Sequence, residues 1–237
     1  MSNILELNNI NVSYGKSQVI RGLSLAIPEG GKTVILGRNG MGKTTTLKSI
    51  IGLLPVGEGS VKYMGKEINK KRTFERSAAG IAYVPQGREI IPNLTVEENI
   101  ELGALGHTKD KEEIKKRKEM VLSYFPAMNE HLARMGGILS GGQQQQLAIC
   151  RALMSKPKVL LLDEPTEGIQ PNIVSEMGSI LNKVNEELGV AILLVEQNLR
   201  FAFKVCNRFV VLEKGQIALS GKKGEVPDSQ IQGYLKV

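Results

Sequence analysis

The sequence predicts an α/β fold in which helices cover both faces of a largely parallel sheet. Short apolar segments alternate with segments of helical periodicity along most of the 237 residues. A glycine-rich loop joins one apolar segment to a helix, and a stretch with only helical periodicity interrupts the alternation between residues 88 and 155. Alternating strands and helices build parallel sheets because each crossover helix packs back onto the sheet.

The first part of the chain is rich in strand signals. Polar and apolar residues alternate there, and Pro28-Glu29-Gly30-Gly31 marks the turn that ends the second strand. Residues 43–51 have helical spacing, and Met64-Gly65-Lys66 indicates the turn of a small hairpin. The expected strands of this part are residues 4–14, 18–27, 32–36, 60–63, 67–68 and 81–84.

Helical periodicity dominates beyond Pro92. Helices are expected over residues 95–105, 109–125 and 143–154, and Thr95 with Glu98 forms the capping-box pattern of a helix start. The alternation then resumes, with strands at 159–162 and 190–195, helices at 172–188 and 198–206, and a closing hairpin of 208–213 and 216–220.

Composition limits the kinds of partner. The net charge of +7 suits nucleic acid, an anionic membrane surface or phosphorylated ligands. Much of the excess lies in short clusters at residues 70–72, 115–118 and 222–223, which we interpret as solvated surface. Tryptophan is absent and aromatic residues make up only 4%, so a surface of stacked aromatics for single-stranded nucleic acid is not expected.

Cys150 and Cys206 lie among apolar residues and are expected in the core, which fits a reducing compartment. No apolar run approaches the length of a membrane span, and the first residues do not resemble a signal peptide. We therefore expect a soluble protein whose attachment to any membrane comes through a partner.

The loop Gly37-Arg38-Asn39-Gly40-Met41-Gly42-Lys43-Thr44 matches the pattern G-x-x-x-x-G-K-[ST]. It follows an apolar strand and precedes a helix, so its N–H groups and the positive end of the helix can bind phosphate oxygens. Lys43 is expected to reach the β- and γ-phosphates and Thr44 to place its hydroxyl on Mg²⁺, with Thr45 as a further contact. The loop predicts a site for a nucleoside triphosphate.

Two acidic residues, Asp163 and Glu164, follow the buried strand at 159–162. Charge at the mouth of such a strand is costly unless a cation or hydrogen bonds compensate it. Beside a phosphate loop, Asp163 is expected to hold Mg²⁺ and Glu164 to polarise an attacking water as general base. The alternative is a turn at Pro165 with both acids in solvent.

The segment Leu139-Ser140-Gly141-Gly142-Gln143 precedes a helix and offers a second set of exposed N–H groups for an anion. With this segment, and with the order of motifs along nearly the whole chain, the sequence resembles ATP-binding cassette (ABC) proteins. The resemblance implies a P-loop NTPase (ABC ATPase) core with a parallel sheet, an N-terminal antiparallel β subdomain and an inserted helical subdomain. It divides one domain, 1–237, into a core of 1–87 and 156–237 and a helical subdomain of 88–155.

The same resemblance implies ATP and Mg²⁺ as ligands, with each ATP held between two subunits. The phosphate loop of one subunit would bind it together with Ser140, Gly141, Gly142 and Gln143 of the other. Tyr14 resembles the aromatic residue that stacks on adenine, and its alternative is a core tyrosine at a strand end. Gln86 resembles the glutamine that contacts Mg²⁺ and the water and senses the membrane partner, and its alternative is a polar loop residue.

Two positions depart from the family pattern. Gln197 stands where the family usually has a histidine that contacts the γ-phosphate, and Gln170 stands where it usually has an aspartate. Glutamine can donate a hydrogen bond to phosphate but carries no positive charge. Glu164 and Gln197 are the catalytic candidates. The two departures put in question how fast a homodimer of this chain would hydrolyse ATP. His107 and His131 are expected to be plain surface residues.

The departures narrow the subgroup. Val195-Glu196-Gln197-Asn198 resembles the ATPases of amino-acid and amide importers, which work with a second, different ATPase. Residues 85–90, 140–147 and 164–171 are most similar to the second ATPase of a urea importer, with branched-chain amino-acid importers as the close alternative. The implied partners are a second ATPase subunit in a homo- or heterodimer, two transmembrane permease subunits and, through the complex, a periplasmic or extracellular solute-binding protein. The chain would lie in the cytoplasm, peripheral to the inner face of the cell membrane, without direct contact to nucleic acid.

Two other functions stay open. A non-transport ABC ATPase that acts on nucleic acid or ribosomes is favoured by the charge of +7, but the chain has one cassette and no long coiled-coil insertion. A nucleotide-gated scaffold with little catalysis is suggested by Gln197 and Gln170.

Overall fold

The computed structural model describes residues 2–235. Its elements follow the chain as β1 (Asn3–Tyr14), β2 (Ser17–Pro28), β3 (Lys32–Leu36), α1 (Lys43–Ile51), β4 (Glu58–Tyr63), β5 (Lys66–Glu67), α2 (Thr73–Ala78), β6 (Ile81–Val84), α3 (Val96–Leu105), α4 (Lys111–Tyr124), the 3₁₀ helices η1 (Pro126–His131) and η2 (Gly136–Ile138), α5 (Gly141–Leu153), β7 (Val159–Asp163), α6 (Pro171–Leu188), β8 (Ala191–Glu196), α7 (Leu199–Val205), β9 (Arg208–Glu213), β10 (Gln216–Lys222) and α8 (Asp228–Leu235).

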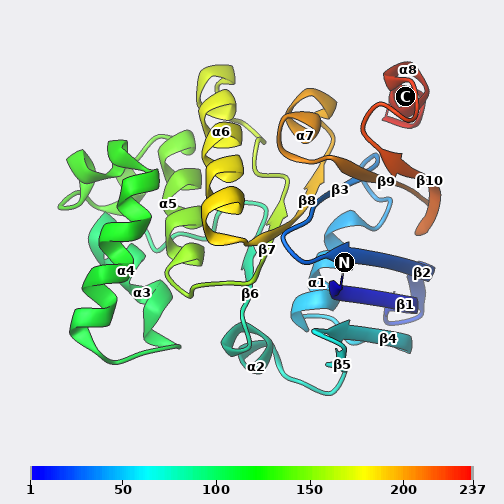
Figure 1. The fold of residues 1–237 in the computed structure, drawn as a ribbon, viewed down its shortest axis with the longest axis horizontal. Helices are drawn as coiled ribbons and strands as arrows, with labels where there is room; N and C mark the ends of the chain where they lie inside the picture. Colours follow the sequence, from blue (N-terminus) through cyan, green and yellow to red (C-terminus); the bar gives the residue numbers. More distant parts are fainter. Residues whose placement is uncertain (1, 236–237) are drawn as a thin grey trace.

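The strands form two sheets. The larger one has the order β10-β9-β3-β8-β7-β6, in which every neighbouring pair is parallel except β10 with β9. The smaller one, β2-β1-β4-β5, is antiparallel throughout. Figure 1 shows α3, α4 and α5 gathered at one end of the molecule and the smaller sheet at the other. The predicted α/β class with a parallel sheet and an antiparallel β subdomain is confirmed.

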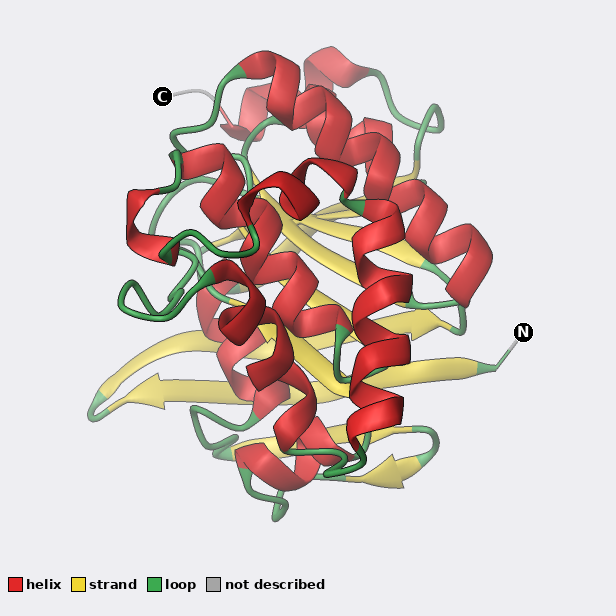
Figure 2. Cartoon of the chain, turned by 90° about the vertical axis from the view of Figure 1, so that its left-hand side faces the viewer, coloured by secondary structure: helices red, strands yellow, loops and turns green. Residues whose placement is uncertain are grey.

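The central strands of the larger sheet are buried on both faces. Along β8, Ile192 and Leu194 belong to one apolar cluster, while Leu193 and Val195 belong to the other. The first cluster includes side chains of α3 to α7, and the second includes α1 and the smaller sheet. Figure 2 shows helices, which belong to the first cluster, in front of the strands. Continuous apolar runs in the sequence are therefore strands that bury both faces, as parallel strands do.

Asn99 on α3 holds the segment between β6 and α3. Its side chain is fully buried, and its amide nitrogen donates to the carbonyl oxygens of Ile91, Leu94 and Thr95. Its carbonyl oxygen accepts from the N–H of Ile91. One side-chain amide thereby provides hydrogen-bond partners for main-chain groups of a loop that belongs to no strand. At the start of the same helix, Thr95 and Glu98 form the predicted capping box.

Two helices were not expected from the sequence, α2 and α8. Arg76 on α2 is only 3% exposed, and its guanidinium donates to the main-chain oxygens of Ser49 and Ile50 at the end of α1. This helix is fixed by a tertiary contact that periodicity in six residues does not reveal. The helix α8 has one fully buried side chain, Ile231, so its amphipathic signal is weak.

Both cysteines are buried, as predicted, and burial raises the pKa of each thiol. His107 and His131 are half-buried, so the expectation of plain surface residues is wrong for both. Burial lowers the pKa of His107. Of the helices described between residues 2 and 235, none has both the length and the apolar character that a bilayer span requires.

Replacing Asn99 by aspartate tests the loop anchor. The new oxygen cannot donate to the three carbonyl oxygens and would face them with negative charge. We expect the free energy of unfolding to fall by about 2–4 kcal/mol, measured by urea denaturation. The control is Asn129→Asp, because Asn129 is exposed and its amide donates only to the Pro126 oxygen. Equal stability of the two variants would contradict the anchoring role.

Candidate functional site

Four neighbouring parallel strands end at one edge of the larger sheet. In the order β3-β8-β7-β6, they lead into the loop at Gly37, Gln197, Glu164 and the segment that contains Gln86. Because the carboxyl ends of parallel strands share an edge, residues far apart in sequence meet there. Asp163 and Glu196 are the last residues of β7 and β8. This edge is the candidate site.

The phosphate loop bends sharply into α1. Gly42, which precedes the helix, has a left-handed backbone with φ of 100°. A Cβ there would lie 2.5 Å from Cδ1 of Ile20 on β2, so the position requires glycine both for its backbone and for its space. Lys43 opens the helix and is 4% exposed. The first N–H groups of α1 therefore face the loop, the arrangement that binds anions.

An ion pair lies inside the loop. The Lys43 Nζ is 3.0 Å from Oε1 of Glu164, and it also donates to the main-chain oxygen of Arg38 at 3.1 Å. The two charged side chains are only 4% and 11% exposed. Glu164 itself has φ of 44°, an uncommon conformation for a residue with a side chain. The strained backbone directs its carboxylate toward the phosphate loop rather than into solvent, against the alternative of a solvated turn.

Gln197 joins the same group. Its side-chain nitrogen donates to both carboxylate oxygens of Glu164, at 3.0 and 3.1 Å, and to Oδ1 of Asn39 at 2.7 Å. The glutamine thus bridges the phosphate loop and the acid. It provides the donor that a histidine would provide at this place, without a charge.

Asp163 lies beside this group and is 1% exposed. Its Oδ1 accepts from the hydroxyl of Thr44 at 2.9 Å, and its Oδ2 accepts from the hydroxyl of Tyr83 at 3.0 Å. Burial raises the pKa of the Asp163 carboxyl above its ordinary value, while the two hydrogen bonds offset part of that rise. Burial and then the charge of Asp163 raise the pKa of Tyr83.

The oxygen atoms of Thr44 and Asp163 fit a hard divalent cation such as Mg²⁺, which takes oxygen ligands. Within residues 2–235, no group of three or more His, Cys, Asp or Glu side chains could hold a metal alone. Mg²⁺ typically binds through one or two protein groups, with phosphate oxygens and water in the other positions, so this small donor set suits it.

Not every predicted site residue joins this group. Gln86 donates to the carboxylate of Glu167 at 2.9 Å, while the hydrogen bonds around Asp163 come from Thr44 and Tyr83. Tyr14 is 46% exposed at the end of β1. The roles predicted for both residues stay predictions.

The segment of residues 139–143, which we call the signature segment, contains the start of α5. Ser140 caps this helix, accepting from the N–H of Gln143, whose side chain accepts from the N–H of Ser140. The Gln143 amide nitrogen is 2.8 Å from Nε2 of His131. In the described residues, no side-chain hydrogen bond of Ser140 or Gln143 reaches the phosphate loop. Figure 1 shows α5 and α1 on opposite sides of β6 and β7. The phosphate loop and the signature segment, the two segments predicted to bind anions, do not meet in one chain.

The sequence profile of the ABC transporter family matches residues 20–167, more than half of the chain. The chain belongs to this family. It is 39% identical over 216 residues, 91% of each chain, to the high-affinity branched-chain amino acid transport ATP-binding protein BraG of Pseudomonas aeruginosa. It is 37% identical over 223 residues, 94% of each chain, to the probable branched-chain amino acid transport ATP-binding protein LivF of Archaeoglobus fulgidus.

A solved dimeric ATP-binding cassette in a post-hydrolysis state with ADP and phosphate matches with a TM-score of 0.83 and 29% identity, over 92% of this chain and 98% of that one. The chain is thus an ABC ATPase, an enzyme of a class that binds ATP and ADP. ATPase subunits of this class dimerise and work with membrane permeases.

Sequence reasoning missed three residues at this edge of the ABC ATPase. Tyr83 supports Asp163, Glu167 receives Gln86, and Glu196 lies buried at the end of β8. The signal for Glu196 was present in the sequence, because it is a carboxylate that directly follows the apolar run of β8. Such a position is costly without partners, as it is for Asp163.

Replacing Asp163 by asparagine should stabilise the nucleotide-free chain at neutral pH. The pKa of Asp163 is higher in the folded chain than its ordinary value, so the folded chain binds the proton more tightly than the unfolded chain. The charge of Asp163 therefore lowers the free energy of unfolding at neutral pH. This destabilisation is lost as the pH falls, first through the raised pKa of the folded chain and then below about 3.9, the ordinary pKa of an aspartate. The Tm of Asp163→Asn should exceed that of the wild type at pH of about 7, and the difference should shrink in acid.

This comparison is made by thermal unfolding without nucleotide or metal. Asp228→Asn, at the exposed start of α8, is the control and should bring no such gain. A lower Tm for Asp163→Asn than for the wild type at neutral pH would show that the charge is favourable where it lies.

Proposed function

We propose that the chain hydrolyses ATP to drive an importer of branched-chain amino acids, or of urea and related amides. The observation that carries the catalytic part is the contact of Lys43, Glu164 and Gln197 at the sheet edge. A cation for phosphate and an amide donor both lie within hydrogen-bond distance of one carboxylate, that of Glu164. This constellation suits transfer of a phosphoryl group to water.

In this proposal the loop of residues 37–44 binds the phosphates with its N–H groups, and Lys43 contacts the terminal ones. Glu164 accepts a proton from the attacking water, and Gln197 orients Glu164 and donates to the γ-phosphate. Thr44, Asp163 and Gln86 would hold Mg²⁺, which would supply positive charge to the phosphate oxygens. Tyr14 would stack on the adenine.

A second ATPase subunit would complete each site. The signature residues Ser140 to Gln143 lie apart from the phosphate loop of the same chain, which supports a nucleotide held between two chains. The dimeric cassette with ADP and phosphate supports the same arrangement. We expect two transmembrane permeases and a solute-binding protein in the full complex, with this chain at the cytoplasmic face of the membrane.

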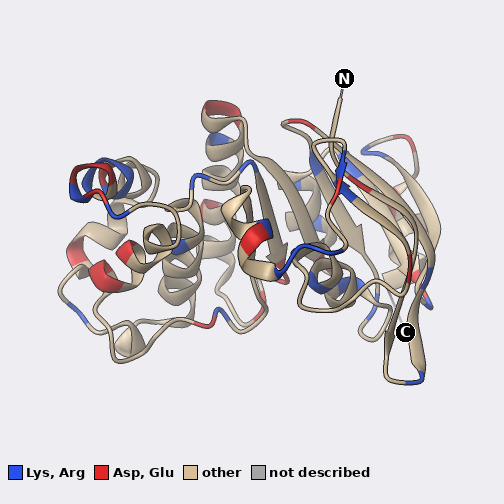
Figure 3. Cartoon of the chain, turned by 90° about the horizontal axis from the view of Figure 1, so that it is seen from below, with Lys and Arg blue, Asp and Glu red and all other residues tan. Residues whose placement is uncertain are grey.

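The solute is proposed from relatives. Two similar proteins are named for branched-chain amino acid transport, while residues 85–90, 140–147 and 164–171 resemble a urea importer's second ATPase. The alternative of a nucleic-acid-acting ABC ATPase has less support. Figure 3 shows Lys and Arg on many elements of the molecule and interspersed with Asp and Glu, rather than gathered on one element.

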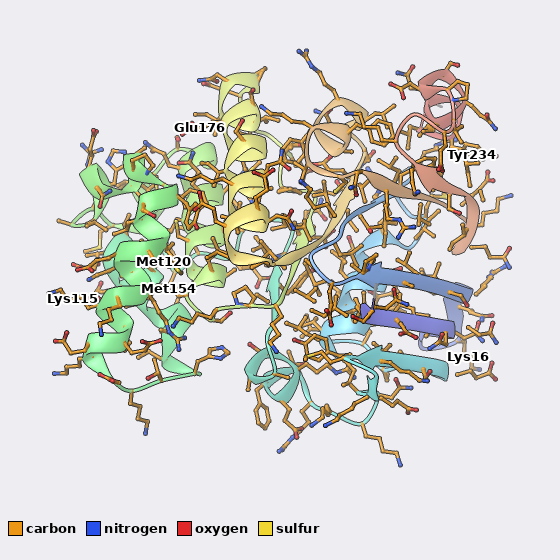
Figure 4. The ribbon with its side chains drawn as sticks, in the orientation of Figure 1. Lys16, Lys115, Met120, Met154, Glu176 and Tyr234 are labelled. Carbon is orange, nitrogen blue, oxygen red and sulfur yellow. The ribbon has the colours of Figure 1, made fainter. Side chains whose placement is uncertain are left out.

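The variant Glu164→Gln tests the general base. The amide has nearly the same shape but cannot accept the proton of water, so we expect ATP binding to persist and turnover to fall by at least about 100-fold. Nucleotide binding is followed by a fluorescent ATP analogue and turnover by phosphate release. Glu176→Gln is the matched control, since Glu176 is exposed on α6 and its label in Figure 4 lies away from β3 and α1. Turnover like that of the wild type would remove Glu164 from this role.

Reconstituted transport tests the importer. The chain, copurified with its permeases and partner ATPase in proteoliposomes, should support ATP-dependent uptake of labelled leucine or urea, and Glu164→Gln should abolish it. Uptake of one solute alone identifies the substrate class. Failure to copurify any membrane subunit, together with DNA binding that weakens steeply with salt, would favour the nucleic-acid alternative.

A further inference from the structure

Glu196, the last residue of β8, is a buried carboxylate outside the roles described above. It is 3% exposed and lies between two loops. Its Oε1 accepts from the N–H of Thr166 at 3.2 Å and from the hydroxyl of Thr166 at 2.6 Å. Its Oε2 accepts from the N–H groups of Gln197 and Asn198, at 2.9 and 3.0 Å. Four donors thus converge on one carboxylate.

These donors belong to the two segments that carry the catalytic candidates. Thr166 lies two residues after Glu164, and Gln197 directly follows Glu196. Asn198 accepts from the N–H of Phe201 and so begins α7, which fixes the direction in which the chain leaves Gln197. Glu164 is itself joined to β8, because its N–H donates to the carbonyl oxygen of Val195. One side chain therefore ties the loop of the acid to the loop of the glutamine.

Simple packing does not account for this residue. Burial raises the pKa of Glu196, and the hydrogen bonds offset only part of that rise. An apolar residue would avoid the cost of burying the carboxyl, and the N–H groups of Thr166, Gln197 and Asn198 would then need other partners. The position favours an acceptor of four hydrogen bonds, which only a carboxylate provides.

We propose that Glu196 is a positioning residue of the ATPase site, which sets the distance between Gln197 and Glu164. The Gln197 amide reaches both oxygens of Glu164 at 3.0 and 3.1 Å only while the two loops hold their relative place. A shift of about 1 Å in such a group can cost about 100-fold in rate. This inference rests on the proposed function, in which Glu164 and Gln197 act on ATP.

The variant Glu196→Gln weakens the link between the loop of Glu164 and the loop of Gln197, while the shape of the side chain changes little. Its single carbonyl oxygen can accept from one pair of donors, and its NH₂ must face the other pair. Because the Thr166 hydroxyl can turn to accept, the NH₂ is best placed there, where it confronts the Thr166 N–H. We expect kcat for ATP to fall by about 10- to 100-fold with KM changed less than about twofold. Thr166→Val, which removes only the hydroxyl, should lower kcat by about 3- to 10-fold.

A double-mutant cycle with Gln197→Ala tells positioning from a general structural effect. Where the glutamine side chain is absent, its position no longer matters, so Glu196→Gln should lower kcat by less than about twofold in that background. ATPase is measured on the full-length chain, with its partner subunits where turnover requires them. If Glu196→Gln does not fold, the same cycle with Thr166→Val decides.

The outcomes are distinct. Equal losses from Glu196→Gln in both backgrounds, or kcat within twofold of the wild type, would overturn this inference even if Glu164→Gln is inactive. Full activity of both Glu164→Gln and Gln197→Ala would instead remove the proposed function on which it rests. Glu176→Gln serves again as the exposed control, for which kcat should stay unchanged.

Discussion

The parallel register of β3, β8, β7 and β6 is the constraint on which the rest of this molecule depends. It brings the ends of four strands to one edge, although the residues that follow them are separated by up to 160 positions, from Gly37 to Gln197. Apolar side chains bury these strands on both faces, and a slip of one residue would move each side chain into the cluster on the other face, where the packing differs. The chemistry of the edge is thus specified by the burial of the strands rather than by the loops alone.

Lys43, Asp163, Glu164 and Glu196 are charged groups at this edge that are almost fully buried, and each has a specific partner. Lys43 pairs with Glu164, Asp163 accepts two hydroxyl groups, and Glu196 accepts four donors. A buried charge without such partners would be severely destabilising. The hydrogen bonds and the ion pair that offset the cost of burying these groups also hold their side chains in place.

Features of the fold and of the site that depend on a local sequence pattern could be predicted from the sequence. The phosphate loop, the acids at the end of β7 and the start of α5 were predictable because glycine spacing, apolar runs and capping residues are local signals. The helix α2 and the role of Glu196 were not, because each depends on contacts across the fold: Arg76 with the end of α1, and Glu196 with Thr166, 30 residues away. The hydrogen bond of Gln86 to Glu167 was hidden for the same reason, since it joins two loops across the edge.

The hydrogen bonds of Gln197 indicate that one chain alone does not have the donors that a bound ATP requires. Its amide already has three acceptors, one on Asn39 and two on Glu164, yet it has only two hydrogens to donate. A γ-phosphate would be a further acceptor, so Gln197 cannot bind it fully without giving up one of the present contacts. Lys43 donates to Glu164 and to the main-chain oxygen of Arg38, so one of its three hydrogens stays available to phosphate. Binding of ATP to Gln197 must therefore rearrange its contacts with Asn39 and Glu164, and the donors that replace the amide there have to come from water or from the signature segment of a second subunit.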